Sequence, residues 1–104
     1  MNTKIKEIEK TFEKGKRVYK QIEATEEYFV YEVVDEDAPT YYEIFSKRIK
    51  PVKGVLLNSD KYKDYTHFVA YPSDEEFGAW AWCCSTPAKV EMIKRIKFFN
   101  DVQE

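Results

Sequence analysis

The chain has 104 residues, close to the commonest size of a single domain, and we expect one α+β domain over residues 1–104. Its 17 basic and 19 acidic residues nearly balance, which argues against a strong polyanion-binding protein and against an acidic tail. No stretch is apolar enough for a membrane helix, and the first residues lack a signal-peptide core. We therefore expect a cytoplasmic protein with no membrane partner.

The N-terminal segment has the spacing of an amphipathic helix. Thr3 is followed by Ile5, Ile8 and Phe12, with charged residues between them and a glycine after them. Apolar residues three or four apart, behind a threonine cap and ahead of a glycine, are typical of a helix. We predict a helix over residues 3–14.

After this segment the apolar residues alternate with a period of two, which is typical of strands. The first two alternating segments flank a polar turn at Thr25 and Glu26, and the second, EYFVYEVV, is rich in β-branched and aromatic residues. Together they predict a hairpin. The five predicted strands cover residues 16–24, 27–34, 40–49, 66–71 and 79–84.

Two helical starts follow from cap residues. Ser73 and Glu76 have the spacing of a capping box and predict a single helical turn. Thr86 followed by Pro87 predicts the start of a longer C-terminal helix that ends near Asp101. The apolar stripe of that helix consists of Val90, Ile93, Ile96 and Phe99.

The order of elements predicts the fold class. Strands that follow one another along the chain favour an antiparallel sheet. We expect an α+β fold with an N-terminal helix, about five mainly antiparallel strands and a C-terminal helix, and with both helices packed on one face of the sheet.

Both tryptophans and both cysteines lie in the segment AWAWCC. On a strand, Trp80, Trp82 and Cys84 share one face, and the small residues on the other face would let a helix approach. We expect both tryptophans to be mostly buried, because large aromatics dominate small cores; an exposed stacking surface is the alternative. Adjacent cysteines do not form a disulfide framework, so both thiols are expected to be reduced.

Catalytic and metal-binding patterns are sparse. The single histidine, His67, would meet Cys83 or Cys84 only if its strand paired with AWAWCC, and a Cys–His enzyme is therefore the weakest alternative. One histidine and two adjacent cysteines do not supply a tetrahedral metal site, and the three glycines lie too far apart for a phosphate loop. We expect no enzyme activity, no cofactor and no metal.

Two segments have the composition of binding surfaces. SKRIKPVK concentrates cations beside aromatic residues, which is typical of single-stranded nucleic-acid binding; its candidate residues are Lys47, Arg48, Lys50 and Lys53. Residues 50–64 form a long connection whose apolar residues either fold back as a satellite core or form an exposed tip. With Tyr19 and Tyr31 expected on the free sheet face, we predict a partner-binding patch that includes Tyr41, Val55, Leu56 and Tyr62.

The segments YEIFSKRI and YPSDEEFGAWAWCCSTPAKVEMIKRIKFF resemble small uncharacterised proteins of bacteriophages and bacterial mobile elements, which share a YP-x-D-x-x-FG-x-WAW segment. The resemblance covers residues 42–99 and implies no catalytic site. It implies a small binder of a host protein that modulates or inhibits a host defence system, acting in the host cytosol. The leading hypothesis is such a protein-binding module, and a nucleic-acid-binding accessory protein is the alternative.

Overall fold

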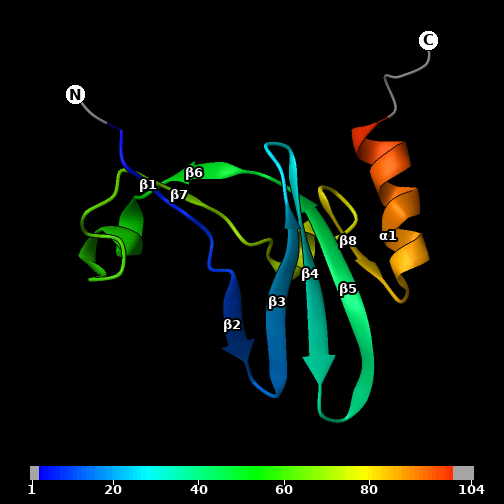
Figure 1. The fold of residues 1–104 in the computed structure, drawn as a ribbon. Coiled ribbons are helices and arrows are strands. Elements are labelled where there is room, and N and C mark those ends of the chain that lie inside the picture. Colours follow the sequence, from blue (N-terminus) through cyan, green and yellow to red (C-terminus); the bar gives the residue numbers. More distant parts are fainter. Residues whose placement is uncertain (1–2, 100–104) are drawn as a thin grey trace. The chain divides into compact units, whose positions relative to one another are not determined.

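A computed structural model describes residues 3–99, which form two compact units (Figure 1). Unit 1 consists of Met1–Glu9 and Lys47–Tyr71, and unit 2 consists of Lys10–Ser46 and Pro72–Glu104. Each unit has a sheet of its own. A single domain over residues 1–104 stays a prediction.

Unit 2 is built on a five-stranded antiparallel sheet in the order β2-β3-β4-β5-β8 (Figure 1). Successive strands along the chain are neighbours from β2 to β5, so tight turns connect them. Gly15 adopts a φ of 64° in the turn between β2 and β3, a conformation that a side chain would disfavour. The strands are β2 (Thr11–Lys14), β3 (Arg17–Ala24), β4 (Tyr28–Asp35), β5 (Ala38–Ser46) and β8 (Ala81–Cys84).

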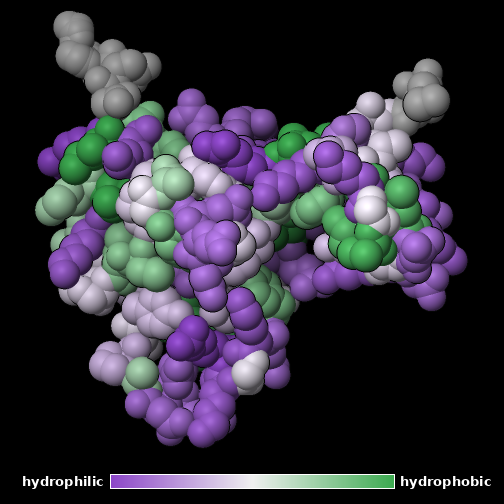
Figure 2. Space-filling model, turned by 180° about the vertical axis from the view of Figure 1, so that it is seen from behind, coloured by the Kyte–Doolittle hydropathy of each residue, from purple (hydrophilic) through white to green (hydrophobic). Residues whose placement is uncertain are grey.

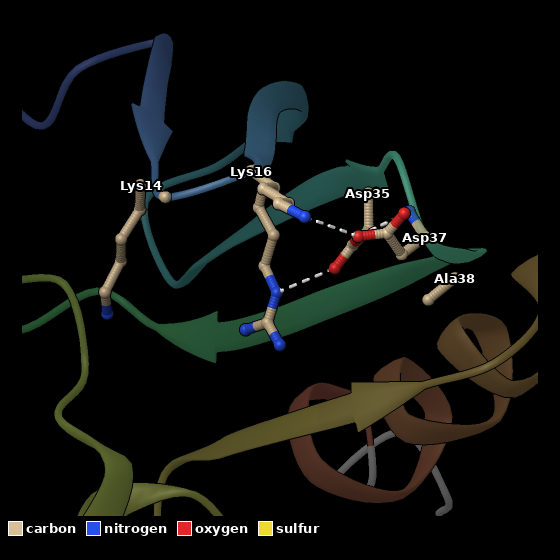
Figure 3. A pocket seen from close by; sticks show the side chains of 7 residues that line it. Lys14, Lys16, Asp35, Asp37 and Ala38 are labelled. Atoms are coloured by element: carbon tan, nitrogen blue, oxygen red, sulfur yellow. Dashed lines mark hydrogen bonds and ion pairs between the residues drawn. The ribbon is translucent and has the colours of Figure 1, made fainter.

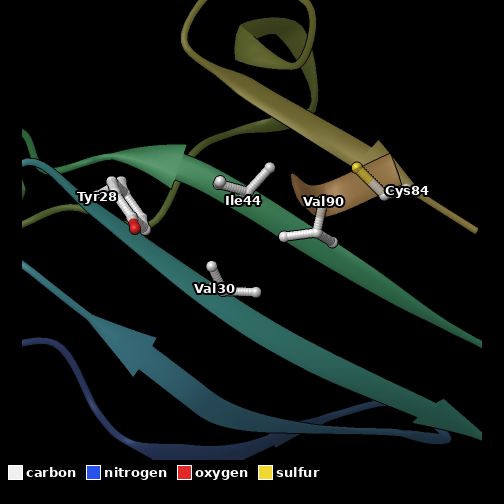
Figure 4. Packing of buried hydrophobic residues seen from close by; sticks show 5 residues of the cluster. All are labelled: Tyr28, Val30, Ile44, Cys84 and Val90. Atoms are coloured by element: carbon white, nitrogen blue, oxygen red, sulfur yellow. The ribbon is translucent and has the colours of Figure 1, made fainter. Parts of the chain in front are cut away.

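One face of this sheet packs against the C-terminal helix. Helix α1 (Pro87–Ile93) begins where Thr86 Oγ1 accepts the Lys89 N–H at 3.2 Å, and it continues into a π-helical turn, η3 (Lys94–Phe98). The buried cluster between helix and sheet is formed by Tyr28, Val30, Ile44, Cys84 and Val90 (Figure 4). Side chains at the margin of this cluster are half-buried: Tyr42, Trp82, Ile93 and Phe98.

The opposite face of the same sheet carries a layer of aromatic rings. Phe12 stacks on Tyr19 with centroids 4.6 Å apart, and Tyr31 stacks on Phe45 at 5.6 Å. The ring of Trp80 meets the edge of Phe45 at 6.4 Å. Tyr31 and Phe45 are fully buried, each 0% exposed. The central strands therefore bury apolar side chains on both faces, together with Glu43 of β5, which is 4% exposed and pairs with Tyr31.

Unit 1 has a small three-stranded sheet in the order β1-β7-β6. Strand β1 (Ile5–Lys6) runs parallel to β7 (His67–Val69), and β6 (Ile49–Pro51) runs antiparallel to it. A 3₁₀ helix, η1 (Gly54–Asn58), lies in the connection between β6 and β7. The buried apolar residues of this unit are Val52, Val69 and Ala70.

The predicted N-terminal helix is wrong. Residues 5–6 and 11–14 are strands: the first pairs with β7, more than fifty residues away, and the second pairs with β3 across the tight turn at Gly15. Ile5 pairs with His67, and Phe12 pairs with Tyr19 and stacks on its ring. A helical spacing of three apolar residues did not determine the structure of this segment, because isoleucine and phenylalanine also favour strands and the strand pairings stabilise that form.

The α+β class and an antiparallel five-stranded sheet are confirmed, but the arrangement of helices is not. The predicted strand 66–71 belongs to the sheet of unit 1 as β7, and β2, from the predicted helix, is a strand of the five-stranded sheet instead. The described residues contain one α-helix, α1, so two helices do not cover one face. Aromatic rings occupy the face opposite α1, and this is where the prediction had placed free tyrosines. Tyr19 and Tyr31 are 2% and 0% exposed, so their assignment to a free surface is wrong.

The hairpin is confirmed, with one irregularity. The register between β3 and β4 shifts between Gln21 and Glu23, so Ile22 is an extra residue that points outward and is 56% exposed. The bulge turns Glu23 to the face that packs against α1, where it pairs with Val30. A strict period of two would have placed Glu23 with Tyr19 on the other face.

The predicted caps are also confirmed. Ser73 and Glu76 form the capping box at η2 (Asp74–Glu76), where the Ser73 N–H donates to Glu76 Oε1 at 2.8 Å. Thr86 and Pro87 begin α1 as expected. The predicted end of that helix at Asp101 lies outside the described residues.

The two tryptophans lie on different faces. Trp80 precedes β8, packs on the aromatic layer and is 6% exposed. Trp82 is half-buried on the helical face, where its ring meets the edge of Phe98 at 6.1 Å. The expectation that the small face of the strand admits the helix is wrong, because α1 packs on the face of Trp82 and Cys84.

Candidate functional site

The most exposed large apolar side chains of the described chain lie in η1 of unit 1. Val55 is 86% exposed and Leu57 is 62% exposed, and η1 contains no buried residue. We call Gly54–Asn58 the tip of unit 1. Figure 2 shows green apolar atoms at this end of the unit, bordered by purple hydrophilic atoms.

A series of tight turns holds the tip in place. The N–H groups of Ser59, Tyr62 and Tyr65 each donate to the carbonyl three residues earlier, at 3.0 to 3.1 Å. The ring of Tyr62 also meets the edge of Phe68 on β7, with centroids 5.2 Å apart. The connection was expected either to fold back as a satellite core or to form an exposed tip, and it does both. Tyr62 and Leu56 are half-buried, whereas Val55 and Leu57 are exposed.

Charge is distributed unequally between the units. Unit 1 has eight Lys and Arg against four Asp and Glu, whereas unit 2 has nine against fifteen. The near-balance of the whole chain therefore hides a basic unit and an acidic unit. This asymmetry could have been found in the sequence only if the boundaries of the units had been known.

All four residues of the predicted nucleic-acid segment lie in unit 1. Lys47 and Lys50 are half-buried, and Lys50 pairs with Phe68 across the sheet. Arg48 and Lys53 are exposed, and Lys53 is the residue directly before η1. The structure thus places one of these cations beside the exposed apolar tip.

The predicted partner-binding patch is divided between the units. Val55, Leu56 and Tyr62 lie together in unit 1, but Tyr41 is a half-buried residue of β5 in unit 2. Burial, together with the neighbouring Tyr19 and Glu43, raises the pKa of the Tyr41 phenol. The Arg17 guanidinium lies 6.0 Å from the centre of the Tyr41 ring.

The Cys–His hypothesis lacks its structural premise. Strand β7, which carries His67, pairs with β1 and β6, whereas β8, which carries both cysteines, pairs with β5. Nδ1 of His67 lies 2.8 Å from Thr66 Oγ1. Burial raises the pKa of both thiols, so Cys83 and Cys84 are protonated at neutral pH and are poor nucleophiles.

Among residues 3–99, no group of three or more His, Cys, Asp or Glu side chains has the arrangement of a metal site. The same residues include no helix with the length and apolarity needed to cross a membrane.

An ion cluster around the buried Lys94 connects η3 to the bulge of β3, and it was not predicted from the sequence. Lys94 is 8% exposed, and its Nζ lies 2.5 Å from Glu23 Oε1 and 2.8 Å from Glu91 Oε2. Tyr28 Oη donates to Glu23 Oε2 at 2.9 Å. The only signal in the sequence is the three-residue spacing of Glu91 and Lys94, because the bulge that turns Glu23 inward leaves no pattern.

The cluster stabilises its charged forms. The hydrogen bond from Lys94 lowers the pKa of Glu23. Burial acts to lower the pKa of Lys94, but its hydrogen bonds to Glu23 and Glu91 outweigh that effect, so the pKa is raised. Burial also raises the pKa of Tyr28. Each group is partnered inside unit 2, so the cluster holds η3 on the sheet.

A hollow in unit 2 lies between the β2–β3 turn and the β4–β5 turn (Figure 3). Two of the cations that line it are paired: Lys16 Nζ lies 2.9 Å from Asp37, and Arg17 Nε lies 3.1 Å from Asp35. The pKa of Asp35 is lowered, first by the Asp37 N–H and then by Arg17. Paired and solvated charges make this hollow a weak anion site.

Comparisons with protein-family models, curated proteins and solved structures gave no match. The resemblance to phage and mobile-element proteins therefore stays a prediction.

Proposed function

We propose that this chain is a non-catalytic protein-binding module that contacts its partner through the tip of unit 1. The observation that carries the proposal is the exposure of Val55 and Leu57, at 86% and 62%, on a tip whose backbone is held by successive turns. Exposure of aliphatic side chains to water is unfavourable, so covering them with a partner's surface contributes favourable free energy to binding. Ordered turns reduce the entropy lost on binding.

The resemblance adds a narrower proposal about the partner. It places the partner among host proteins and makes the chain a modulator of a host defence system, acting in the cytoplasm. No catalytic step is assigned to the chain.

A nucleic-acid-binding accessory protein is the second candidate, and the excess of Lys and Arg in unit 1 favours it. The chemistry of the exposed side chains weighs against it. Bases stack on exposed aromatic rings, whereas the tip presents valine and leucine.

The test is partner capture by variants that differ in one surface. Tagged wild-type protein and the double variant Val55→Asp/Leu57→Asp are used to capture proteins from host lysate. The matched control is Met92→Asp, because Met92 is also an exposed apolar residue, at 56%, but lies on α1 of unit 2. Thermal unfolding of each variant shows whether it is folded.

We expect the double variant to remain folded and to lose the captured protein, while Met92→Asp retains it. Retention by the folded double variant would contradict the proposal. Loss with Met92→Asp alone would place the interface on the helix.

A further inference from the structure

Resting on the proposed function of the tip, we infer that its partner is a different protein with an acidic surface around an apolar pocket. Val55 and Leu57 would enter the pocket, and the cations of unit 1 would face the acidic rim. Protein interfaces commonly combine an apolar centre with a polar rim.

The charge around the tip supports an acidic partner. Within Lys47–Tyr71 there are six Lys and Arg against two Asp. Lys53 directly precedes the tip, and Lys61 and Lys63 follow it. All three are exposed, as are Asp60 and Asp64, which flank the two later lysines. A basic rim attracts an acidic surface and disfavours a basic one.

The state of the aromatic rings favours a protein over a nucleic acid. Tyr62 packs edge-on against Phe68, and Lys6 lies 5.7 Å over the ring of Tyr65. These rings are partly occupied by contacts within unit 1, while the most exposed side chains are aliphatic. Stacking therefore contributes little, and the apolar tip fits a pocket lined by side chains.

The acidic unit 2 of a second copy would also complement the charge of unit 1. Such a contact would join two different surfaces of the chain, leaving one of each unused on every pair. Further copies would then add to the pair until a ring or an open fibre formed. The inference therefore assigns the acidic surface to a different protein. Self-association becomes an outcome that the experiment must detect.

The experiment selects short random peptides on the immobilised full-length chain. We expect the enriched peptides to combine several Asp or Glu with an aliphatic or aromatic anchor. Peptides of neutral or basic composition would overturn the inference. The strongest peptide is then synthesised, and its affinity for variants is measured by fluorescence anisotropy.

Two charge-reversal variants distinguish the effect of the rim charges on binding from the effect of the net charge of the chain. Lys53→Glu/Lys61→Glu/Lys63→Glu changes the rim. The matched control, Lys10→Glu/Lys20→Glu/Arg95→Glu, makes the same change at exposed residues of unit 2. We expect the rim variant to bind the acidic peptide about tenfold more weakly and the control to bind within about twofold of wild type.

The failures of the two proposals are distinguishable. If Val55→Asp/Leu57→Asp abolishes binding but the two charge-reversal variants bind equally, the tip is a binding site and the acidic partner is wrong. If the double variant binds like wild type, the proposed function fails. Tighter binding of a poly-dT oligonucleotide than of the peptide, or concentration-dependent association of the chain alone in sedimentation, also overturns the inference.

Discussion

Unit 2 has a large buried apolar core, whereas unit 1 has a small one and carries the two most exposed large apolar side chains of the described residues. In unit 2, aromatic and aliphatic side chains are buried on both faces of the central strands, as at Tyr31 and Ile44, each 0% exposed. In unit 1, Val52, Val69 and Ala70 are buried, while Val55 and Leu57 are exposed. We therefore expect most of the stability to come from the sheet of unit 2, and we propose that recognition occurs at the tip of unit 1.

The largest expected effect comes from the aromatic layer. Phe45→Ala removes a ring that is 0% exposed and contacts Phe29, Tyr31 and Trp80. We expect a loss of about 3–5 kcal/mol in the free energy of unfolding, measured by urea denaturation. Leu57→Ala is the control from unit 1. A loss below about 1 kcal/mol for Phe45→Ala would show that the layer is loosely packed.

The next effect concerns the ion cluster around Lys94. Lys94→Ala leaves Glu23 and Tyr28 without their cation, and we expect a loss of about 1–3 kcal/mol, since Glu23 is partly exposed and water compensates in part. Arg95→Ala, at an exposed position of the same turn, is the control. Equal stabilities of the two variants would contradict a structural role for the cluster.

The same cluster predicts a pH dependence. Because the pKa of Glu23 is lowered by folding, its contribution is present above the ordinary glutamate pKa and is lost as pH falls through the lowered value. Lys94, whose pKa is raised, contributes below the ordinary lysine pKa and loses its contribution as pH rises through the raised value. We expect Glu23→Gln to lose less stability than wild type between neutral and acidic pH. A parallel loss in both proteins would exclude Glu23 as a source of acid sensitivity.

Thr86→Ala tests the helix start with a smaller effect. It removes the acceptor of the Lys89 N–H, and we expect a loss of about 1 kcal/mol. Thr86→Ser should restore most of this loss in thermal unfolding, because the hydroxyl acceptor is kept. If Ser and Ala destabilise equally, the hydrogen bond is not the stabilising feature.

Features that depend on residues close together in the sequence could be predicted, whereas features that depend on residues far apart could not. The capping box at Ser73 and the Thr86 cap are local, and both are confirmed. Phe12 became part of a strand through pairing with Tyr19 across the turn at Gly15, although its spacing also fits a helix. Strand β1 formed on β7 more than fifty residues away, and such a pairing leaves no local pattern. The bulge at Ile22, which brings Glu23 to Lys94, was hidden for the same reason.

The candidate site was predictable in part. Alternation and composition identified Val55 and Leu56 in an apolar connection, but the sequence could not show that Leu56 turns inward while Val55 and Leu57 face water. Tyr41 was assigned to the same patch because a free tyrosine face was expected. The aromatic layer buries that face instead, since Phe12 and Trp80 pack onto it.

Hydrogen–deuterium exchange of the free and peptide-bound chain tests the division between stability and recognition most directly. We predict that the amides of Gly54–Asn58 become protected when the acidic peptide binds, while those of β4 exchange slowly in both states. New protection on Pro87–Ile93, with no change at the tip, would contradict the account and move recognition to the helix of unit 2.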